Sequence, residues 1–234
     1  MLKAALFDLD ETLIDRSAMV LKYLEGSYQR FQPGLSHVPY ELYLERFICL
    51  DAFGYNPKEQ VFQNLIDEFK LNFEMPGMNL DFHTYYPPCA VLYEEAELVL
   101  RTLREKGFKL GIITNGASNS QRSKLERTGL NNLVDSIVIS EEVGFQKPDP
   151  AIFEIALKQL QISSSEAIFI GDNPVSDIVG GAAAKMMTVW YENHIPCPPG
   201  LTINPDYVIH SIGETLSLSL FTMGANEKVR EMCE

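Results

Sequence analysis

Two carboxylates, Asp8 and Asp10, stand two residues apart directly after a short apolar run near the start of the chain. In extended backbone, such side chains point to the same side, so their negative charges would repel each other. A hard divalent cation would hold them, because carboxylate oxygens are its preferred ligands. An aspartate can also attack phosphorus to form an aspartyl-phosphate, while a neighbouring carboxyl group protonates the leaving oxygen. The alternative is a polar turn at a strand end.

Two later positions carry groups that suit a phosphate ester. Thr114 and Asn115 end an apolar run ahead of a helical pattern, where a hydroxyl and backbone N–H groups can bind a phosphate oxygen. Lys147 is followed by Pro148 and Pro150, which stiffen the backbone and would fix the ammonium group beside the carboxylates. Taken alone, the threonine is more simply a helix cap and the lysine a solvated surface charge.

A second pair of carboxylates, Asp172 and Asp177, follows the apolar run that ends at Gly171. Together with the first pair they would complete an oxygen-rich magnesium site. The alternative is a capped turn in which Ser176 or Asp177 starts the next helix. Because open α/β sheets bind ligands at the carboxyl ends of their strands, we expect all these groups to meet at one edge.

Apolar runs predict strands that are buried on both faces. They are Ala4–Phe7, Leu110–Ile113, Ile137–Ile139, Ala167–Ile170, Met187–Trp190 and Tyr207–Ile209. Helical patterns separate most of the later runs: Glu94–Lys106, a helix to Leu160 capped by Asp149, and a third capped by Ser176. Strands that alternate with helices predict an α/β fold with a parallel sheet.

Residues 16–88 break this alternation directly after the first strand. They show helical patterns without a convincing strand, and they contain more than half of the chain's aromatic residues. We therefore predict an inserted α-helical domain at 16–88 and an α/β core formed by 1–15 and 89–234. Most of the aromatics are expected to pack a helical bundle. Phe53 and Tyr55, which flank Gly54 in a predicted loop, are the expected exceptions and could stack on a base.

Composition restricts the partners. Hydrophobic residues make up 46% and charged residues 22% of the 234 residues, as in ordinary soluble proteins, so a substantial core is expected. The net charge is −13 and no run of Lys or Arg offsets it, which disfavours a nucleic-acid polymer as a partner. A small phosphorylated metabolite remains compatible, because a few local cations can hold one phosphate.

The cysteines and apolar stretches suggest a compartment. The four cysteines are widely scattered without a CxxC pair, which predicts free thiols in a reducing compartment: Cys49, Cys89, Cys197 and Cys233. No apolar stretch is long enough for a signal peptide or a membrane span. We therefore expect a cytoplasmic protein without a membrane partner. A monomer is expected, with a weak homodimer as the alternative.

These motifs together resemble the haloacid dehalogenase-like (HAD) superfamily over essentially the full length of the chain. The family's motifs are DxDxT, a Thr or Ser at a strand end, a Lys, and GD with a further Asp. They are matched by Asp8, Asp10 and Thr12, by Thr114, by Lys147, and by Gly171, Asp172 and Asp177. The resemblance implies a doubly wound, Rossmann-like parallel sheet with a central first strand. It also implies a helical type 1 cap inserted after that strand.

The resemblance also implies roles for these residues. Asp8 would be the nucleophile and Asp10 the general acid and base. Mg²⁺ would be held by Asp8, the backbone carbonyl of Asp10, and Asp172. Asp177 would support the metal or orient Lys147.

Other groups would bind the phosphate or support the loop. Thr114, Lys147 and backbone amides near Asn115 would bind the phosphoryl oxygens, while Thr12 would brace the loop after the first strand. Haloacid dehalogenases lack an acid at the position of Asp10, because a halide leaves without a proton. The acid here therefore favours a phosphate ester.

The segment Gly111–Leu157 resembles the house-cleaning 5'-nucleotidases of the family through GIITNG, LERTGL and ISEEVG. This resemblance implies a phosphatase acting on nucleoside 5'-monophosphates. A phosphatase of sugar phosphates or other metabolites and a phosphomutase remain alternatives. A non-catalytic binding protein is the alternative from another class, but Asp8, Asp10 and Lys147 are all present.

Overall fold

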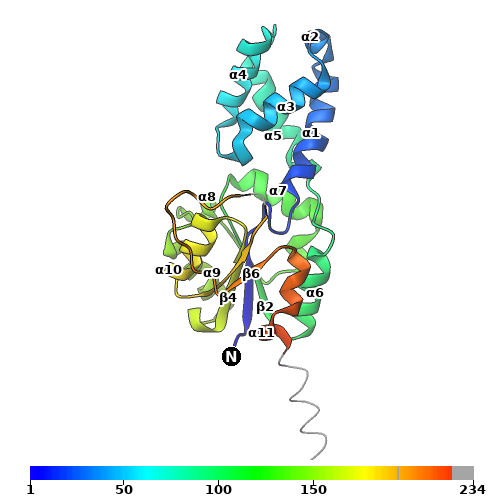
Figure 1. The fold of residues 1–234 in the computed structure, drawn as a ribbon. Helices are drawn as coiled ribbons and strands as arrows, with labels where there is room; N and C mark the ends of the chain where they lie inside the picture. The colour runs from blue at the N-terminus through cyan, green and yellow to red at the C-terminus, as the bar shows by residue number, and fades with distance from the viewer. Residues whose placement is uncertain (194, 223–234) are drawn as a thin grey trace, which may run out of the picture. The chain divides into compact units, whose positions relative to one another are not determined.

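The computed structural model describes residues 1–193 and 195–222, and the chain divides into two compact units (Figure 1). One unit comprises residues 1–15 and those from Leu92 onward, and the other is Arg16–Val91. The sequence prediction ended the insertion at Pro88, which lies inside a helical turn, Pro87–Cys89. This turn packs on helices of the inserted unit and therefore belongs to that unit.

The first unit is built on a six-stranded sheet of order β3-β2-β1-β4-β5-β6, with every neighbouring pair parallel. The strands are β1 (Ala4–Phe7), β2 (Lys109–Thr114), β3 (Ser136–Ile139), β4 (Ala167–Gly171), β5 (Met187–Tyr191) and β6 (Tyr207–Ile209). The chain extends the sheet from β1 in one direction through β2 and β3, and then in the other through β4. This doubly wound order confirms the predicted fold class.

Helices flank this sheet: α6 (Ala96–Glu105), α7 (Ser118–Thr128), α8 (Ser140–Val143), α9 (Pro150–Leu160), α10 (Gly180–Ala183) and α11 (Ser219–Thr222). Figure 1 shows α9 and α10 on one side of the sheet and α6 and α11 on the other. Because strand side chains alternate in direction, Ala4 and Leu6 pack against the buried side chains of α9. All four residues of β1 are buried, as expected for a central parallel strand.

One predicted helix start is confirmed and another is wrong. Asp149 caps α9, and its side chain accepts a hydrogen bond from the backbone N–H of Ala151. The next helical segment is capped by Asn173 rather than Ser176, and begins as a π-helical turn, η5 (Pro174–Val179). Asn173 accepts hydrogen bonds from two backbone N–H groups, and Pro174 suits the first helical position. Ser176 therefore falls inside the first turn.

The inserted unit contains helices only among its regular elements: α1 (Arg16–Arg30), α2 (Gln32–Leu35), α3 (Tyr40–Asp51), α4 (Lys58–Phe69) and α5 (Met75–Tyr85). The expectation that its aromatics pack a bundle is confirmed for six of them, all buried: Tyr23, Tyr43, Phe47, Phe62, Phe82 and Tyr86. Phe69 is half-buried. Phe53 and Tyr55 are 51% and 61% exposed.

Two further predictions concern thiols and membranes. Cys49, Cys89 and Cys197 are free thiols, and Cys233 lies outside the described residues. Across the described ranges, no helix combines the length and the apolar character needed to cross a bilayer.

Candidate active site

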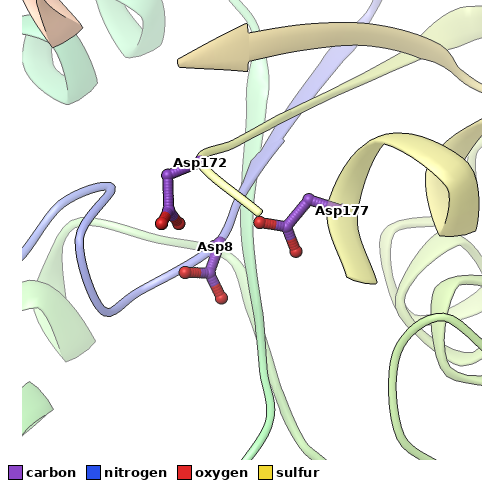
Figure 2. A group of neighbouring side chains, drawn as sticks. All are labelled: Asp8, Asp172 and Asp177. Carbon is purple, nitrogen blue, oxygen red and sulfur yellow. The ribbon is translucent and has the colours of Figure 1, made fainter. Parts of the chain in front are cut away.

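Three buried carboxylates converge at the carboxyl edge of the sheet (Figure 2). Asp8 and Asp172 come directly after the neighbouring strands β1 and β4, and the backbone N–H of Asp8 donates to Ile170 O at 2.9 Å. Asp177 comes from the turn η5. One oxygen from each carboxylate lies within 4.8 Å of the other two. The structure thus brings together residues that the sequence assigned to different strand ends.

Lys147 contacts two members of this group. Its Nζ lies 2.5 Å from Oδ1 of Asp8 and 2.7 Å from Oδ1 of Asp177, and the residue is only 4% exposed. The side chain of Asn115 accepts a hydrogen bond from the Lys147 backbone N–H at 2.8 Å and donates to its carbonyl at 2.9 Å. The Asn115 side chain therefore fixes the backbone that carries the lysine, a role that the sequence did not indicate.

Burial dominates the electrostatics of this cluster. Burial raises the pKa of Asp8 to about 7; Lys147 opposes this shift, while repulsion from Asp177 adds to it. Burial also raises the pKa of Asp172 well above its usual range, with further repulsion from Asp177 and Asp8. Burial lowers the pKa of Lys147, but attraction to Asp177 and Asp8 outweighs burial, so its pKa lies above the usual range. The ammonium group of Lys147 thus contacts two of the three carboxylates, Asp8 and Asp177.

The carboxylate cluster fits a hard divalent cation. Asp172 Oδ2 is buried and accepts no hydrogen bond from any residue that the structure describes, whereas its Oδ1 accepts one from Thr12 at 3.1 Å. A buried carboxylate oxygen without a partner is costly unless a ligand or ion satisfies it. Carboxylate oxygens are the donors that Mg²⁺ prefers.

Gly171 allows the Asp177 side chain to approach the backbone beside Asp172. A Cβ atom at this position would clash with the Asp177 side chain, including Oδ2. The Gly-Asp pair that the sequence singled out therefore has a steric reason: the glycine admits Asp177, and the next residue supplies the carboxylate of Asp172.

Asp10 lies outside this cluster and contacts helix α7. Lys124 and Gln121 of that helix both bond to its carboxylate, and Gln121 also donates to Thr114 Oγ1 at 2.6 Å. The sequence did not single out Gln121 or Lys124. Their i, i+3 spacing, with buried Leu125 next to Lys124, places them on one helix face and is the pattern that could have revealed them.

A doubly wound sheet with carboxylates at its switch point is typical of an α/β enzyme, and the cluster fits a divalent cation. The chain belongs to the haloacid dehalogenase-like hydrolase family, whose model matches residues 5–191. The predicted family is therefore confirmed.

Known relatives are similar over much of their length. The chain is 32% identical over 197 residues to a glyceraldehyde 3-phosphate phosphatase of Pyrococcus abyssi, with 82% of each chain covered. It is 37% identical over 147 residues to the pyrimidine 5'-nucleotidase YjjG of Escherichia coli, covering 62% of this chain and 64% of YjjG. The magnesium-bound structure of the HAD-hydrolase YfnB from Bacillus subtilis matches with a TM-score of 0.75 at 25% identity, covering 94% and 99% of the two chains.

Proposed function

We propose that this protein is a magnesium-dependent phosphatase that hydrolyses small phosphate monoesters through an aspartyl-phosphate on Asp8. The observation that carries the proposal is the position of the Asp8 carboxylate, in contact with Lys147 and within 4.8 Å of Asp172 and Asp177. An anionic nucleophile beside a fixed cation and a metal site matches the needs of phosphoryl transfer. The names of two relatives, a phosphatase and a 5'-nucleotidase, support the reaction class.

In the first step, an oxygen of Asp8 forms a bond to phosphorus and the ester P–O bond breaks. The carboxyl group of Asp10 gives its proton to the departing alkoxide, which leaves as an alcohol. Lys147 and Thr114 bind the phosphoryl oxygens. Mg²⁺, held by Asp8, Asp172 and the backbone carbonyl of Asp10, would reduce the repulsion between nucleophile and phosphate.

In the second step, the Asp10 carboxylate takes a proton from a water molecule, whose oxygen bonds to phosphorus. The P–O bond to Asp8 then breaks, which releases inorganic phosphate and restores both carboxyl groups. Asp177 holds Lys147 in place through their 2.7 Å contact and supports the metal site. Thr12 braces Asp172 by its hydrogen bond at 3.1 Å.

Nucleoside 5'-monophosphates are the substrate class that we propose first. The similarity to YjjG at 37% identity supports this class. The inserted helical unit is the proposed cap, and its exposed Phe53 and Tyr55 offer flat faces on which a base can stack. A three-carbon sugar phosphate is the second candidate, because the similarity to the glyceraldehyde 3-phosphate phosphatase covers more of the chain.

Phosphate release from a panel of esters tests the proposal. The panel contains pyrimidine and purine nucleoside 5'-monophosphates, glyceraldehyde 3-phosphate, hexose phosphates and nitrophenyl phosphate, each with Mg²⁺ and with EDTA. We expect release that requires Mg²⁺ and falls at least about 10³-fold in Asp8→Asn. Asp67→Asn, which changes an exposed acid on α4, is the matched control and is expected to retain full activity.

The outcomes separate the candidates. Preference for a nucleotide that is lost in Phe53→Ala and Tyr55→Ala supports the base-stacking role of the cap, whereas preference for glyceraldehyde 3-phosphate supports the second candidate. An isomeric phosphate ester in place of inorganic phosphate identifies a mutase. Full activity of Asp8→Asn would show that the nucleophile is assigned wrongly.

A further inference from the structure

Helix α7 carries a buried cation directed at Asp10. The Lys124 side chain is 6% exposed, and its Nζ lies 2.8 Å from Oδ1 and 2.7 Å from Oδ2 of Asp10. A lysine is rarely buried in a folded protein unless it is paired. Contact with both carboxylate oxygens restricts the rotation of the Asp10 side chain more than contact with a single oxygen would.

Gln121 adds a second restraint and links Asp10 to the phosphate-binding edge. Its Nε2 donates to Asp10 Oδ2 at 3.0 Å and to Thr114 Oγ1 at 2.6 Å, and its Oε1 accepts from Lys124 Nζ at 2.7 Å. Gln121 is 2% exposed, so this network is shielded from solvent. The amide therefore ties the position of Asp10 to that of the Thr114 hydroxyl.

The buried and open sides of Asp10 are distinct. Its side chain is 25% exposed, whereas the lysine behind it is almost fully covered. The next residue, Glu11, has a positive φ of 62° and bends the chain away from the strand direction. A carboxylate in such a bend needs side-chain contacts to hold one orientation, and α7 supplies them from the buried side.

We infer that Lys124 and Gln121 are positioning residues that hold the Asp10 carboxyl group in the orientation needed for proton transfer. This inference rests on the proposed function, in which Asp10 protonates the leaving oxygen and later deprotonates water. Proton transfer depends steeply on the placement of the donor and acceptor atoms. Neither residue touches the phosphoryl group in this scheme.

The chemistry of the leaving group separates the two steps. A nitrophenolate leaves without a proton, so formation of the aspartyl-phosphate from nitrophenyl phosphate does not need Asp10. Hydrolysis of that intermediate still needs a base to take the proton of water. Misplacing Asp10 should therefore leave the first step nearly intact and slow the second, so that one equivalent of nitrophenolate appears in a burst.

The experiment is a double-mutant cycle on the full chain with Mg²⁺ and nitrophenyl phosphate. Lys124→Met, Asp10→Asn and the double variant are compared with wild type for the nitrophenolate burst and for steady-state turnover. Arg127→Met, on the exposed face of the same helix, is the matched control. Gln121→Met is the second variant, which carries the same test if Lys124→Met does not fold.

We expect Lys124→Met to lower turnover by about 10- to 100-fold, within the range that a positioned proton-transfer group contributes. The burst is expected to keep nearly one equivalent per protein. On the Asp10→Asn background the same substitution should change turnover by less than about twofold, because its effect passes through Asp10. Lys124→Arg should recover part of the loss.

Other results would overturn the inference. Equal losses from Lys124→Met with and without Asp10, or a smaller burst with unchanged turnover per active protein, would indicate a merely structural lysine. Unchanged turnover in both Lys124→Met and Gln121→Met would also show that these residues do not position Asp10. If wild type gives neither burst nor turnover with any ester, the proposed function fails and the inference fails with it.

Discussion

The two units treat buried carboxylates differently. In the helical unit, Asp81 accepts hydrogen bonds from Arg30 at 2.5 and 2.7 Å and from the hydroxyl of Tyr23 at 3.1 Å. Asp51 in the same unit lies 2.7 Å from Arg16 and 2.6 Å from Lys58. Each of these two buried carboxylates therefore has at least one cation of its own.

The α/β unit balances its charges less completely. Asp8, Asp172 and Asp177 converge. Lys147, which forms salt bridges with Asp8 and Asp177, is the one cation paired with this cluster among the described residues. Because a buried charge without compensation is costly, such a cluster persists when a ligand or metal supplies the missing charge. A buried carboxylate whose charge is balanced thus indicates a structural role, whereas a surplus of buried carboxylates indicates a binding site.

The largest effect on stability is expected at Lys147. Among the residues that the structure describes, Lys147 is the one cation paired with the cluster, so in EDTA Lys147→Met should lower the free energy of unfolding by about 3–5 kcal/mol. Urea denaturation measures this change. Lys158→Met, on the exposed surface of α9, should stay within about 0.5 kcal/mol of wild type. An unchanged urea midpoint for Lys147→Met would show that this lysine does not stabilise the carboxylate cluster.

A smaller loss is expected in the helical unit. Within the described part of the chain, Arg30→Met leaves the buried Asp81 carboxylate with the Tyr23 hydroxyl as its remaining hydrogen-bond donor. Because the arginine side chain is 32% exposed, the expected loss is about 2 kcal/mol. Saturating Mg²⁺ should stabilise the variant and wild type equally. Arg46→Met, which breaks an exposed pair with Glu68, is the control and should cost less than about 1 kcal/mol. If Mg²⁺ stabilised Arg30→Met more than wild type, the conclusion that Asp81 has a purely structural role would be wrong.

The pH dependence of stability should also differ between wild type and Asp8→Asn in EDTA. The folded pKa of Asp8 is about 7, above its ordinary value of 3.8. Its contribution to stability is therefore complete below the ordinary value and is lost as pH rises through about 7. Wild type should lose stability relative to Asp8→Asn between about pH 4 and about pH 7. Denaturation curves at several pH values measure the difference in stability between the two proteins. A difference that does not change with pH would show that the pKa of Asp8 is not raised.

The smallest effect is expected at the cap of η5. Asn173→Ala removes the acceptor for two backbone N–H groups and should cost about 1 kcal/mol. Because η5 carries Asp177, Mg²⁺ affinity measured by calorimetry should also fall a few-fold. Ser163→Ala removes a capping box before the amino end of β4, whereas Asp172 follows the carboxyl end of that strand. It should cost a similar amount of stability and leave Mg²⁺ affinity unchanged. Equal Mg²⁺ affinities in Asn173→Ala and Ser163→Ala would show that the cap of η5 does not support the metal site.

Much of the core was predictable because its signals are local. The apolar runs from Ala4 to Phe7 and from Ala167 to Ile170 predicted the strands, and Asp8 and Asp172 follow them directly. The helix after β4 was misassigned because Ser176 is as good a cap by type as Asn173. Only the backbone geometry shows which residue stands outside the helix.

The sequence by itself determined the strands, the fold class and the polar residues at the strand ends, because side-chain periodicity and strand propensity act over a few neighbouring residues. Tertiary structure decided which carboxylate meets which cation. Lys147 pairs with Asp8 and Lys124 with Asp10 although the members of each pair are far apart in the chain. These contacts depend on β1 lying between β2 and β4. A local pattern can place Gln121 and Lys124 on one face of α7, but it does not show which carboxylate that face meets.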